Sequence, residues 1–269
     1  DTRLSRGLGD VYKRQIAVAD VNGDSHLELV GLTQSDNLVS LAGLSGEEDW
    51  LSAEMVGNSN IYPDCVENTD LNICDGWDPT SVADLDGDGD WEVLTAAAIS
   101  DGSGGGVEAW FEHDFDPWIE RNGPSDWISW ELNHADIDGD GVHEIIIADG
   151  VYDTNGTRLW SVSLSRFPDT ALQVSTIVVE ADGDEAAEVV FLGYDSFQVV
   201  DGDGTVLHSV STWDLSSDAM YWSNDGLGCA GDLDGDGEME VVVPSHHLID
   251  NETDVQISAW ELDLSLIHI

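Results

Sequence analysis

The sequence predicts an all-β fold, a β-propeller built from four-stranded antiparallel blades. Three observations predict it. A segment of about 50 residues recurs five times, each copy places short β-branched runs on both sides of an acidic loop, and a hairpin signal follows the second run. A repeat of that length is typical of propeller blades and is long for a leucine-rich or ankyrin repeat. No stretch of the 269 residues offers a convincing amphipathic helix.

The five copies align on their acidic loops. These loops span residues 20–28, 84–92, 136–144, 180–188 and 232–240, and their first positions are 64, 52, 44 and 52 residues apart. Runs such as Ile177–Val179 before a loop and Val241–Val243 after one are β-branched and lack clean alternation. That pattern favours strands covered on both faces.

A hairpin completes each unit. Residues 151–160 and 199–208 match position for position, with Asn155-Gly156 and Asp203-Gly204 as turn dipeptides. Such pairs supply the positive φ that tight hairpin turns require. One unit is therefore strand, acidic loop, strand, strand, turn, strand, which makes one blade. We interpret the DGDG at 201–204 as this ordinary turn.

Each acidic loop indicates a metal site. When the first acid is counted as position 1, oxygen-bearing side chains recur at positions 3, 5 and 9, and position 4 is always glycine. Alternate side chains on a tightly curled loop converge, and glycine permits the curl. Such carboxylates repel one another unless a cation lies between them, and Ca²⁺ takes six to eight oxygens, including backbone carbonyls. Position 7 varies in side chain, as expected if its carbonyl is the ligand.

We therefore expect about three to five Ca²⁺ ions. Mg²⁺ ranks lower because it demands strict octahedral geometry, and zinc is disfavoured because no Cys or His side chain is an expected ligand. The first loop is weakened by Asn22 and by Ser25 at position 6, and the fourth by Glu180 and Glu185. The expected ligands at positions 1, 3, 5, 7 and 9 are Asp84, Asp86, Asp88, Asp90 and Glu92; Asp136, Asp138, Asp140, Val142 and Glu144; Asp232, Asp234, Asp236, Glu238 and Glu240; Asp20, Asn22, Asp24, His26 and Glu28; and, without position 7, Glu180, Asp182, Asp184 and Glu188.

The EF-hand is the obvious rival, because it begins with the same D-x-D-x-D-G pattern. EF-hand loops close with an acid at position 12. Here position 12 is never acidic: it is Gly31, Thr95, Ile147, Phe191 and Val243. The loops close instead at position 9 and run straight into a strand, which excludes the EF-hand.

The five units resemble FG-GAP/VCBS repeats, the family that includes the propeller of integrin alpha chains. The motif D-x-D-G-D-G-x-x-E is matched at every defining position by residues 84–92, 136–144 and 232–240, fairly by 20–28 and only in degenerate form by 180–188. The resemblance covers residues 16–262. It implies Ca²⁺-binding loops that join the first two strands of each blade. The hairpin ending in Leu159-Trp160 also resembles quinoprotein-type propeller repeats, without the full tryptophan-docking pattern of that class.

The two ends of the chain differ from the rest. Residues 1–15 hold four of the seven Lys and Arg residues. They resemble translated sequencing-adaptor read-through, and so does the tail at 263–269. We therefore expect residues 16–262 to form the propeller domain, with the ring incomplete and any signal peptide not observable.

Cysteine and tryptophan give further expectations. Cys65 and Cys74 lie in an insertion at 52–79 and either form a disulfide or stay as free thiols, whereas Cys229 is expected to be a small buried hydrophobe. We expect the strand tryptophans to pack between blades, and the tryptophans near the insertion at 112–129 to be candidates for an exposed platform. The first set is Trp50, Trp110, Trp160 and Trp260; the second is Trp118, Trp127 and Trp130.

Charge restricts the function. The formal net charge is −49, from 56 acidic and 7 basic residues, which disfavours nucleic acid and anionic membranes as partners. No apolar run reaches the ~18 residues of a membrane span, and no catalytic motif such as G-x-S-x-G, H-E-x-x-H or a Walker loop occurs.

We expect an extracellular or cell-surface Ca²⁺-binding module that binds a protein or carbohydrate in adhesion. One alternative is a polysaccharide-degrading enzyme, because some lyases are built on similar Ca²⁺-bearing propellers. The shortage of Lys and Arg argues against it, since an acidic sugar needs its charge neutralised. Another alternative is a spacer of a large surface protein. The acidity also fits a salt-adapted source.

Overall fold

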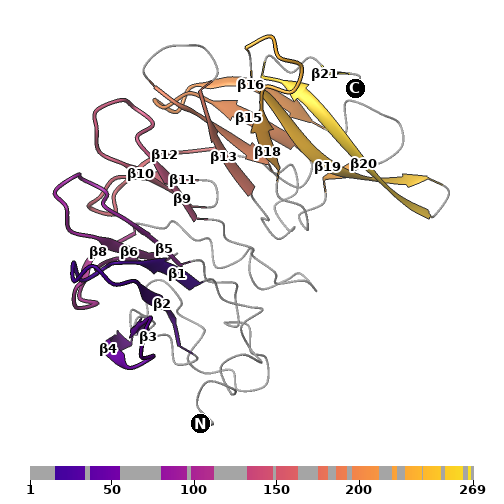
Figure 1. Ribbon diagram of the computed structural model, residues 1–269. Helices are drawn as coiled ribbons and strands as arrows, with labels where there is room; N and C mark the ends of the chain where they lie inside the picture. The colour runs from indigo at the N-terminus through magenta and orange to yellow at the C-terminus, as the bar shows by residue number, and fades with distance from the viewer. Residues whose placement is uncertain are drawn as a thin grey trace, which may run out of the picture.

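In a computed structural model of the chain, the strands form five antiparallel sheets that follow one another along an arc (Figure 1). The structure describes residues 16–33, 37–54, 80–95, 98–111, 132–147, 150–162, 175–180, 186–192, 196–211, 220–222, 228–237, 239–249, 252–262 and 266–267. Each sheet corresponds to one sequence repeat and is called here a blade, numbered 1 to 5. The predicted all-β propeller architecture is confirmed.

Blades 1 to 4 each have four strands in which sequence neighbours pair. Blade 1 comprises β1 (Ile16–Ala19), β2 (Glu28–Leu32), β3 (Asn37–Ala42) and β4 (Glu48–Glu54). Blade 2 comprises β5 (Thr80–Ala83), β6 (Glu92–Thr95), β7 (Ala98–Asp101) and β8 (Val107–Trp110). Blade 3 comprises β9 (Leu132–Ala135), β10 (Glu144–Ile147), β11 (Gly150–Tyr152) and β12 (Arg158–Ser161). Blade 4 comprises β13 (Ser175–Val179), β14 (Glu188–Leu192), β15 (Ser196–Val200) and β16 (Val206–Ser211).

Blade 5 departs from the four-stranded pattern. Its strands are β17 (Met220–Trp222), β18 (Cys229–Gly231), β19 (Glu240–Ile249), β20 (Glu252–Glu261) and β21 (Leu266–Ile267). The second strand of the repeat, β19, is ten residues long, so both β17 and β18 pair along it. Part of the predicted tail therefore belongs to the sheet, because β21 pairs with β20.

Antiparallel order fixes which loops lie together. Since each strand reverses the direction of the one before it, the loop between the first and second strands and the turn between the third and fourth lie at the same end of the blade. A backbone bond joins the two in blade 1, where Gly43 N donates to Leu27 O at 2.9 Å. The same bond recurs in blade 2, where Gly102 N donates to Trp91 O at 2.8 Å.

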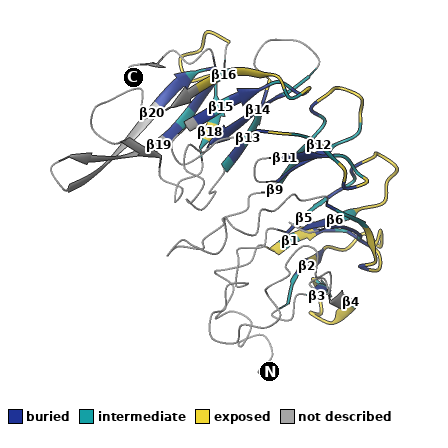
Figure 2. Cartoon of the chain, turned by 180° about the vertical axis from the view of Figure 1, so that it is seen from behind, coloured by how far each residue is buried: buried dark blue, intermediate teal, exposed yellow. Residues whose placement is uncertain are grey.

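The hydrophobic core lies between successive blades. Between blades 2 and 3, Leu94 and Ile99 pack against Ile145 of the next sheet. Every residue of β14 is buried, which is why its residues 189–192 are apolar without alternation. Figure 2 shows this burial as dark blue inner strands and yellow peripheral loops.

Tryptophans lock neighbouring blades together. Trp50 Nε1 donates to Gly102 O of the next blade at 2.9 Å, and Trp160 Nε1 donates to Gly202 O at 2.9 Å. Trp260 is 4% exposed and meets Phe197 edge to face. Interblade packing is thus confirmed for these three residues, and a tryptophan-docking contact that the sequence pattern did not reveal occurs at two interfaces.

The prediction for Cys229 is wrong, because its side chain is exposed. Cys229 pairs with Val242, whereas the adjacent Val241 and Val243 face blade 4. Cys229 therefore lies on the side of blade 5 that no described blade covers. The expectations for Cys65 and Cys74, and for the three tryptophans near the insertion, lie outside the described residues. Within those residues the structure has no helix long and apolar enough to span a membrane.

Candidate metal centre

The acidic loops are called here loops 1 to 5 after their blades. Loops 1, 2, 3 and 5, which the structure describes at positions 4 and 6, have a common backbone shape. In loop 2 Gly87 and Gly89, at positions 4 and 6, have φ of 74° and 95°. In loop 1 position 6 is Ser25, which still adopts a φ of 70° and is the one described residue other than glycine with a positive φ. The loop shape therefore requires the left-handed region at both positions, as the glycine pattern predicts.

Hydrogen bonds to the backbone hold the carboxylates in place. In loop 3, Asp136 accepts from Gly139 N at 2.8 Å through Oδ1 and from Gly141 N at 2.9 Å through Oδ2. Asp138 Oδ1 accepts from Asp140 N at 3.1 Å, and Asp140 Oδ1 accepts from Val142 N at 2.8 Å. The side chains at positions 1, 3 and 5 are thus fixed by the turn itself.

The glutamate at position 9 also makes a hydrogen bond to the loop backbone, which the sequence analysis did not predict. Its Oε2 accepts the backbone N–H of position 2: Val21 N to Glu28 at 3.1 Å, Leu85 N to Glu92 at 2.8 Å, and Ile137 N to Glu144 at 3.0 Å. Glu240 accepts from Leu233 N in the same way. The closing residue therefore ties the two ends of the loop together.

Burial perturbs these glutamates. Loss of solvation raises the pKa of Glu28, Glu92 and Glu144, against the lowering effect of the backbone N–H that each accepts. Nearby loop aspartates raise the pKa further. In the absence of a cation, these carboxylates are therefore harder to ionise than ordinary glutamates.

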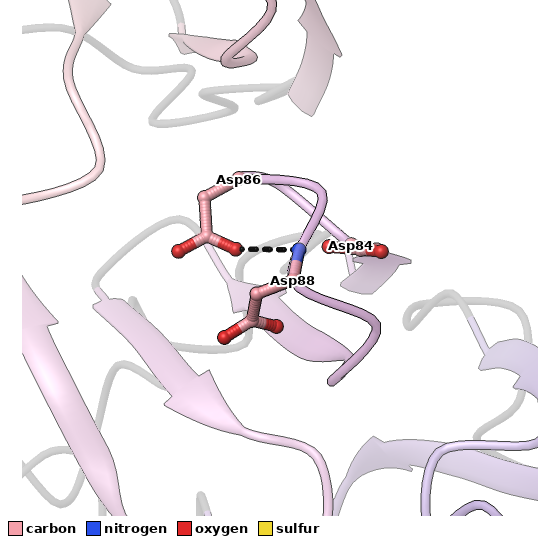
Figure 3. A group of neighbouring side chains, drawn as sticks. All are labelled: Asp84, Asp86 and Asp88. Carbon is pink, nitrogen blue, oxygen red and sulfur yellow. Dashed lines mark hydrogen bonds between the residues drawn. The ribbon is translucent and has the colours of Figure 1, made fainter.

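Three loops bring carboxylates together closely enough for one ion. In each, three residues offer oxygens within 4.8 Å of one another. Figure 3 shows the set in loop 2, with Asp88 N donating to Asp86 Oδ1. These are the three loops with the complete motif, and the triads are Asp84, Asp86 and Asp88; Asp136, Asp138 and Glu144; and Asp232, Asp234 and Glu240.

The other expected ligands fall outside these triads. Glu92, Asp140 and Asp236 belong to the same loops but not to the triads. Within the described part of loop 1, no such triad forms around Asp20, Asp24 and Glu28. His26 places Nδ1 3.1 Å from Asp24 Oδ1. In loop 4 Glu180 is exposed and Glu188 is buried, while Asp182, Asp184 and, in loop 5, Glu238 lie outside the described residues.

The donor set fits a hard cation. Asp20 Oδ1 and Asp84 Oδ1 are buried and have no hydrogen-bond partner, an arrangement that is costly unless another group satisfies the oxygen. Every side-chain ligand of the three triads is a carboxylate oxygen, the type that Ca²⁺ and Mg²⁺ prefer. Arg158 is the one Lys or Arg among the described residues, so basic side chains do little to offset the carboxylates.

A depression of about 410 Å³ lies beside loop 2. Besides the carboxylates of the loop, it is lined by Asp101, Ser103 and Glu108 of blade 2 and by Thr154 of blade 3. Burial, followed by the charge of Asp101, raises the pKa of Glu108. A surface of this sign favours cationic ligands and repels anionic ones.

Neighbouring loops are joined directly. His143 N of loop 3 donates to Leu85 O of loop 2 at 2.8 Å, and Ala187 N of loop 4 donates to Ile137 O of loop 3 at 3.1 Å. Position 8 of one loop thus contacts position 2 of the preceding one. Position 2 is also the residue whose N–H binds the closing glutamate, so these hydrogen bonds connect the backbone of one loop to that of the next.

Comparison with known proteins supports the architecture. A scan of protein-family models and a search of curated proteins found no match. Among solved structures, the chain resembles the V. cholerae biofilm matrix protein Bap1, with 21% identity and a TM-score of 0.56 over 93% of this chain and 38% of Bap1. It also resembles rhamnogalacturonan lyase YesW, with 19% identity and a TM-score of 0.57 over 94% of this chain and 50% of YesW. The chain thus spans no more than half of either protein, and at these identities the likeness establishes the fold alone.

Proposed function

We propose that this chain is a Ca²⁺-binding β-propeller that serves as an extracellular or cell-surface module for binding a protein or carbohydrate in adhesion. The observation that carries the metal assignment is the convergence of three carboxylates within 4.8 Å in each of the three loops with the complete motif. The ions would brace the loops between the first and second strands of the blades.

Ca²⁺ suits these loops better than Mg²⁺. The carboxylates come from one short segment together with backbone groups, and Ca²⁺ tolerates irregular sets of six to eight oxygens, whereas Mg²⁺ requires near-ideal octahedral geometry. The buried oxygen of Asp84 gives the ion one ligand that water does not already satisfy.

Binding is favoured over catalysis. Bap1, whose fold this chain resembles, is a biofilm matrix protein, which fits an extracellular adhesion role for a similar fold. The second candidate is a polysaccharide lyase, for which the likeness to YesW is the specific support. Against it, the described residues hold a single Lys or Arg, Arg158, to neutralise an acidic sugar. Incubation with rhamnogalacturonan and ultraviolet detection of the unsaturated product separates the two, since product formation would establish the lyase.

The metal assignment is tested with the triple variant Asp86→Asn, Asp138→Asn and Asp234→Asn. Asparagine at position 3 keeps the turn, because in loop 1 Asn22 Oδ1 accepts from Asp24 N at 3.0 Å. We expect excess Ca²⁺ to raise the Tm of the parent chain, since a ligand that binds only the native state stabilises it. The rise should shrink strongly in the triple variant, and calorimetric titration should show fewer bound ions.

Asp203→Asn is the matched control. Asp203 occupies a hairpin turn and accepts from Thr205 N at 2.8 Å, so it resembles a loop aspartate without belonging to a metal triad. Its Ca²⁺ response should equal that of the parent chain. Equal Tm in Ca²⁺ and in EDTA for the parent chain would show that the loops are plain acidic turns. In that case the proposal fails.

A further inference from the structure

Blade 1 exposes an apolar residue at a position that the other four blades bury. Leu29 follows the closing glutamate of loop 1 and is 39% exposed, whereas its equivalents are at most 1% exposed. Ile16 is 52% exposed, whereas its equivalents Thr80 and Thr176 are buried and Leu132 and Gly228 are half-buried. Figure 2 shows β1 largely in yellow. The buried equivalents of Leu29 are Val93, Ile145, Val189 and Val241.

Strand register places the exposed residues on one face. Val18 pairs with Leu29, and Leu29 pairs in turn with Leu41. The next row runs from Ile16 through Gly31 and Val39 to Leu51, which is half exposed. The opposite face, with Ala19, Val30 and Leu38, packs on blade 2. In blade 2 the face equivalent to the exposed one carries Val82 and Val93 and packs on blade 1.

The turn between the third and fourth strands shows what covers such a face. In blades 2 and 4 this turn holds the indole of the preceding blade, through Trp50 Nε1 to Gly102 O and Trp160 Nε1 to Gly202 O. The indole lies so close that a Cβ at Gly105 would be 2.5 Å from the Trp50 ring, and a Cβ at Gly204 would be 2.8 Å from the Trp160 ring. These turns are therefore shaped around an indole.

Blade 1 has the same turn. Gly46 has the φ of +67° found at Gly105, and Gly43 N makes the backbone bond that Gly102 N makes. Within the part of the chain that the structure describes, nothing lies within 4 Å of where a Cβ would stand at Gly46. The turn is thus built for an indole, and the space over it is open.

We propose that this face of blade 1 is a docking surface for one further blade of the same repeat, whose fourth-strand tryptophan lies over Gly46 and donates its indole N–H to the Gly43 carbonyl. The proposal continues the interface that blades 1 and 2 and blades 3 and 4 already make. It is independent of whether the loops bind Ca²⁺.

A second copy of this chain is the rival occupant. Blade 5 exposes the other half of the same kind of interface, because Leu233 is 49% exposed whereas its equivalents Val21, Leu85 and Ile137 are at most 3% exposed. However, the fourth strand of blade 5, β21, is Leu266–Ile267 and carries no tryptophan. A second copy would therefore leave Gly46 uncovered, which favours a further blade.

The test adds a blade to the full chain. A copy of residues 132–175 is inserted between residues 15 and 16, so that blade 3, with Trp160, meets β1 through the connection that it makes with blade 4. Hydroxyl-radical footprinting then measures oxidation of Leu29 and Ile16, which occur once in this tandem chain. We expect their oxidation to fall from the parent rate to the rate of Val93. Trp160→Ala in the added copy alone should restore part of the oxidation.

Two further measurements test whether an indole docks at Gly46 and whether the result depends on the blade that is added. Gly46→Ala should lower the Tm of the tandem chain more than that of the parent, because the new Cβ displaces an indole only where one is docked. A second tandem chain carries, at the same place, a copy of residues 80–131 instead, which is blade 2 with Trp110 at the end of its fourth strand. It repeats the test with a different added blade, in case the first one does not fold. Unchanged oxidation of Leu29 and Ile16 in both tandem chains would overturn the proposal. Protection of both residues in the parent chain that grows with its concentration would also overturn it, in favour of the second copy.

Discussion

At the scale of the single residue, Ser25 in loop 1 carries backbone strain that glycine would avoid. Ser25 has a φ of 70° at a position where loops 2, 3 and 5 use glycine, and an L-residue in the left-handed region costs about 1–2 kcal/mol. Ser25→Gly removes that strain while its backbone N–H still donates to Asp20 Oδ2. We therefore expect the Tm measured in EDTA to rise by about 2–4 °C. An unchanged or lower Tm would show that Ser25 makes a compensating contact.

The closing glutamates set the pH dependence. Burial raises the pKa of Glu28, Glu92 and Glu144 in the folded chain, so the native state binds protons more tightly than the unfolded state does. Without metal, their contribution is therefore full below the unfolded glutamate pKa of about 4.3 and is lost as the pH rises through the folded values. If the loops bind Ca²⁺ as proposed, the sign should reverse in excess Ca²⁺, because the ionised carboxylates would bind the ion.

We accordingly expect the Tm in EDTA to fall between pH 4.5 and 7, and the Tm in excess Ca²⁺ to rise over the same range. Differential scanning calorimetry at matched ionic strength measures both slopes. The triple variant Asp86→Asn, Asp138→Asn and Asp234→Asn should lose most of the positive slope. Parallel slopes with and without Ca²⁺ would contradict the coupling between these glutamates and the ion.

At the scale of the element, the turn glycines separate backbone strain from packing. Gly46 and Gly105 share a φ of +67°, but among the described residues an indole, that of Trp50, lies only over Gly105 of the two. Alanine at either position meets the same left-handed strain, and at Gly105 it must also displace the ring, at a further cost of about 1–3 kcal/mol. We expect Gly105→Ala to lower the free energy of unfolding clearly more than Gly46→Ala. Urea denaturation of the two variants measures the difference, and equal losses would mean that the Trp50 contact adds little.

The elements also show which features of the fold and of the loops can be predicted from the sequence. The strands that flank the loops, and the positive φ at positions 4 and 6, were predictable because they depend on local pattern and on glycine. The bond from Ile137 N to Glu144 was not, because it depends on how two strands are registered across the loop. Cys229 was predicted to be buried and is exposed, since burial there depends on a neighbouring blade rather than on the residue itself. Trp50 was expected between blades, but its carbonyl partner, Gly102, lies 52 residues away.

At the scale of the whole molecule, the large negative net charge is the main electrostatic feature. The net charge is −49, and three bound Ca²⁺ ions would change it only to −49 + 6 = −43. The ions can therefore relieve repulsion within the loops but not across the surface. Surface repulsion falls when salt shortens the screening length from roughly 10 Å at 0.1 M to 3 Å at 1 M. Two kinds of cation effect should thus be separable: a specific one in the loops and a general one over the blades.

We expect NaCl to raise the Tm in EDTA, because compact carboxylates repel one another more than those of the unfolded chain do. In saturating Ca²⁺ the Tm should still rise with NaCl, but from a higher starting value, since the loops are already neutralised. Sucrose at matched osmolality controls for solvent exclusion, and the triple loop variant should keep the NaCl response while losing the Ca²⁺ response. A Tm that does not change from 0.05 to 1 M NaCl would mean that the acidic surface is already relaxed at low salt. The acidity would then carry no sign of adaptation to a salty environment.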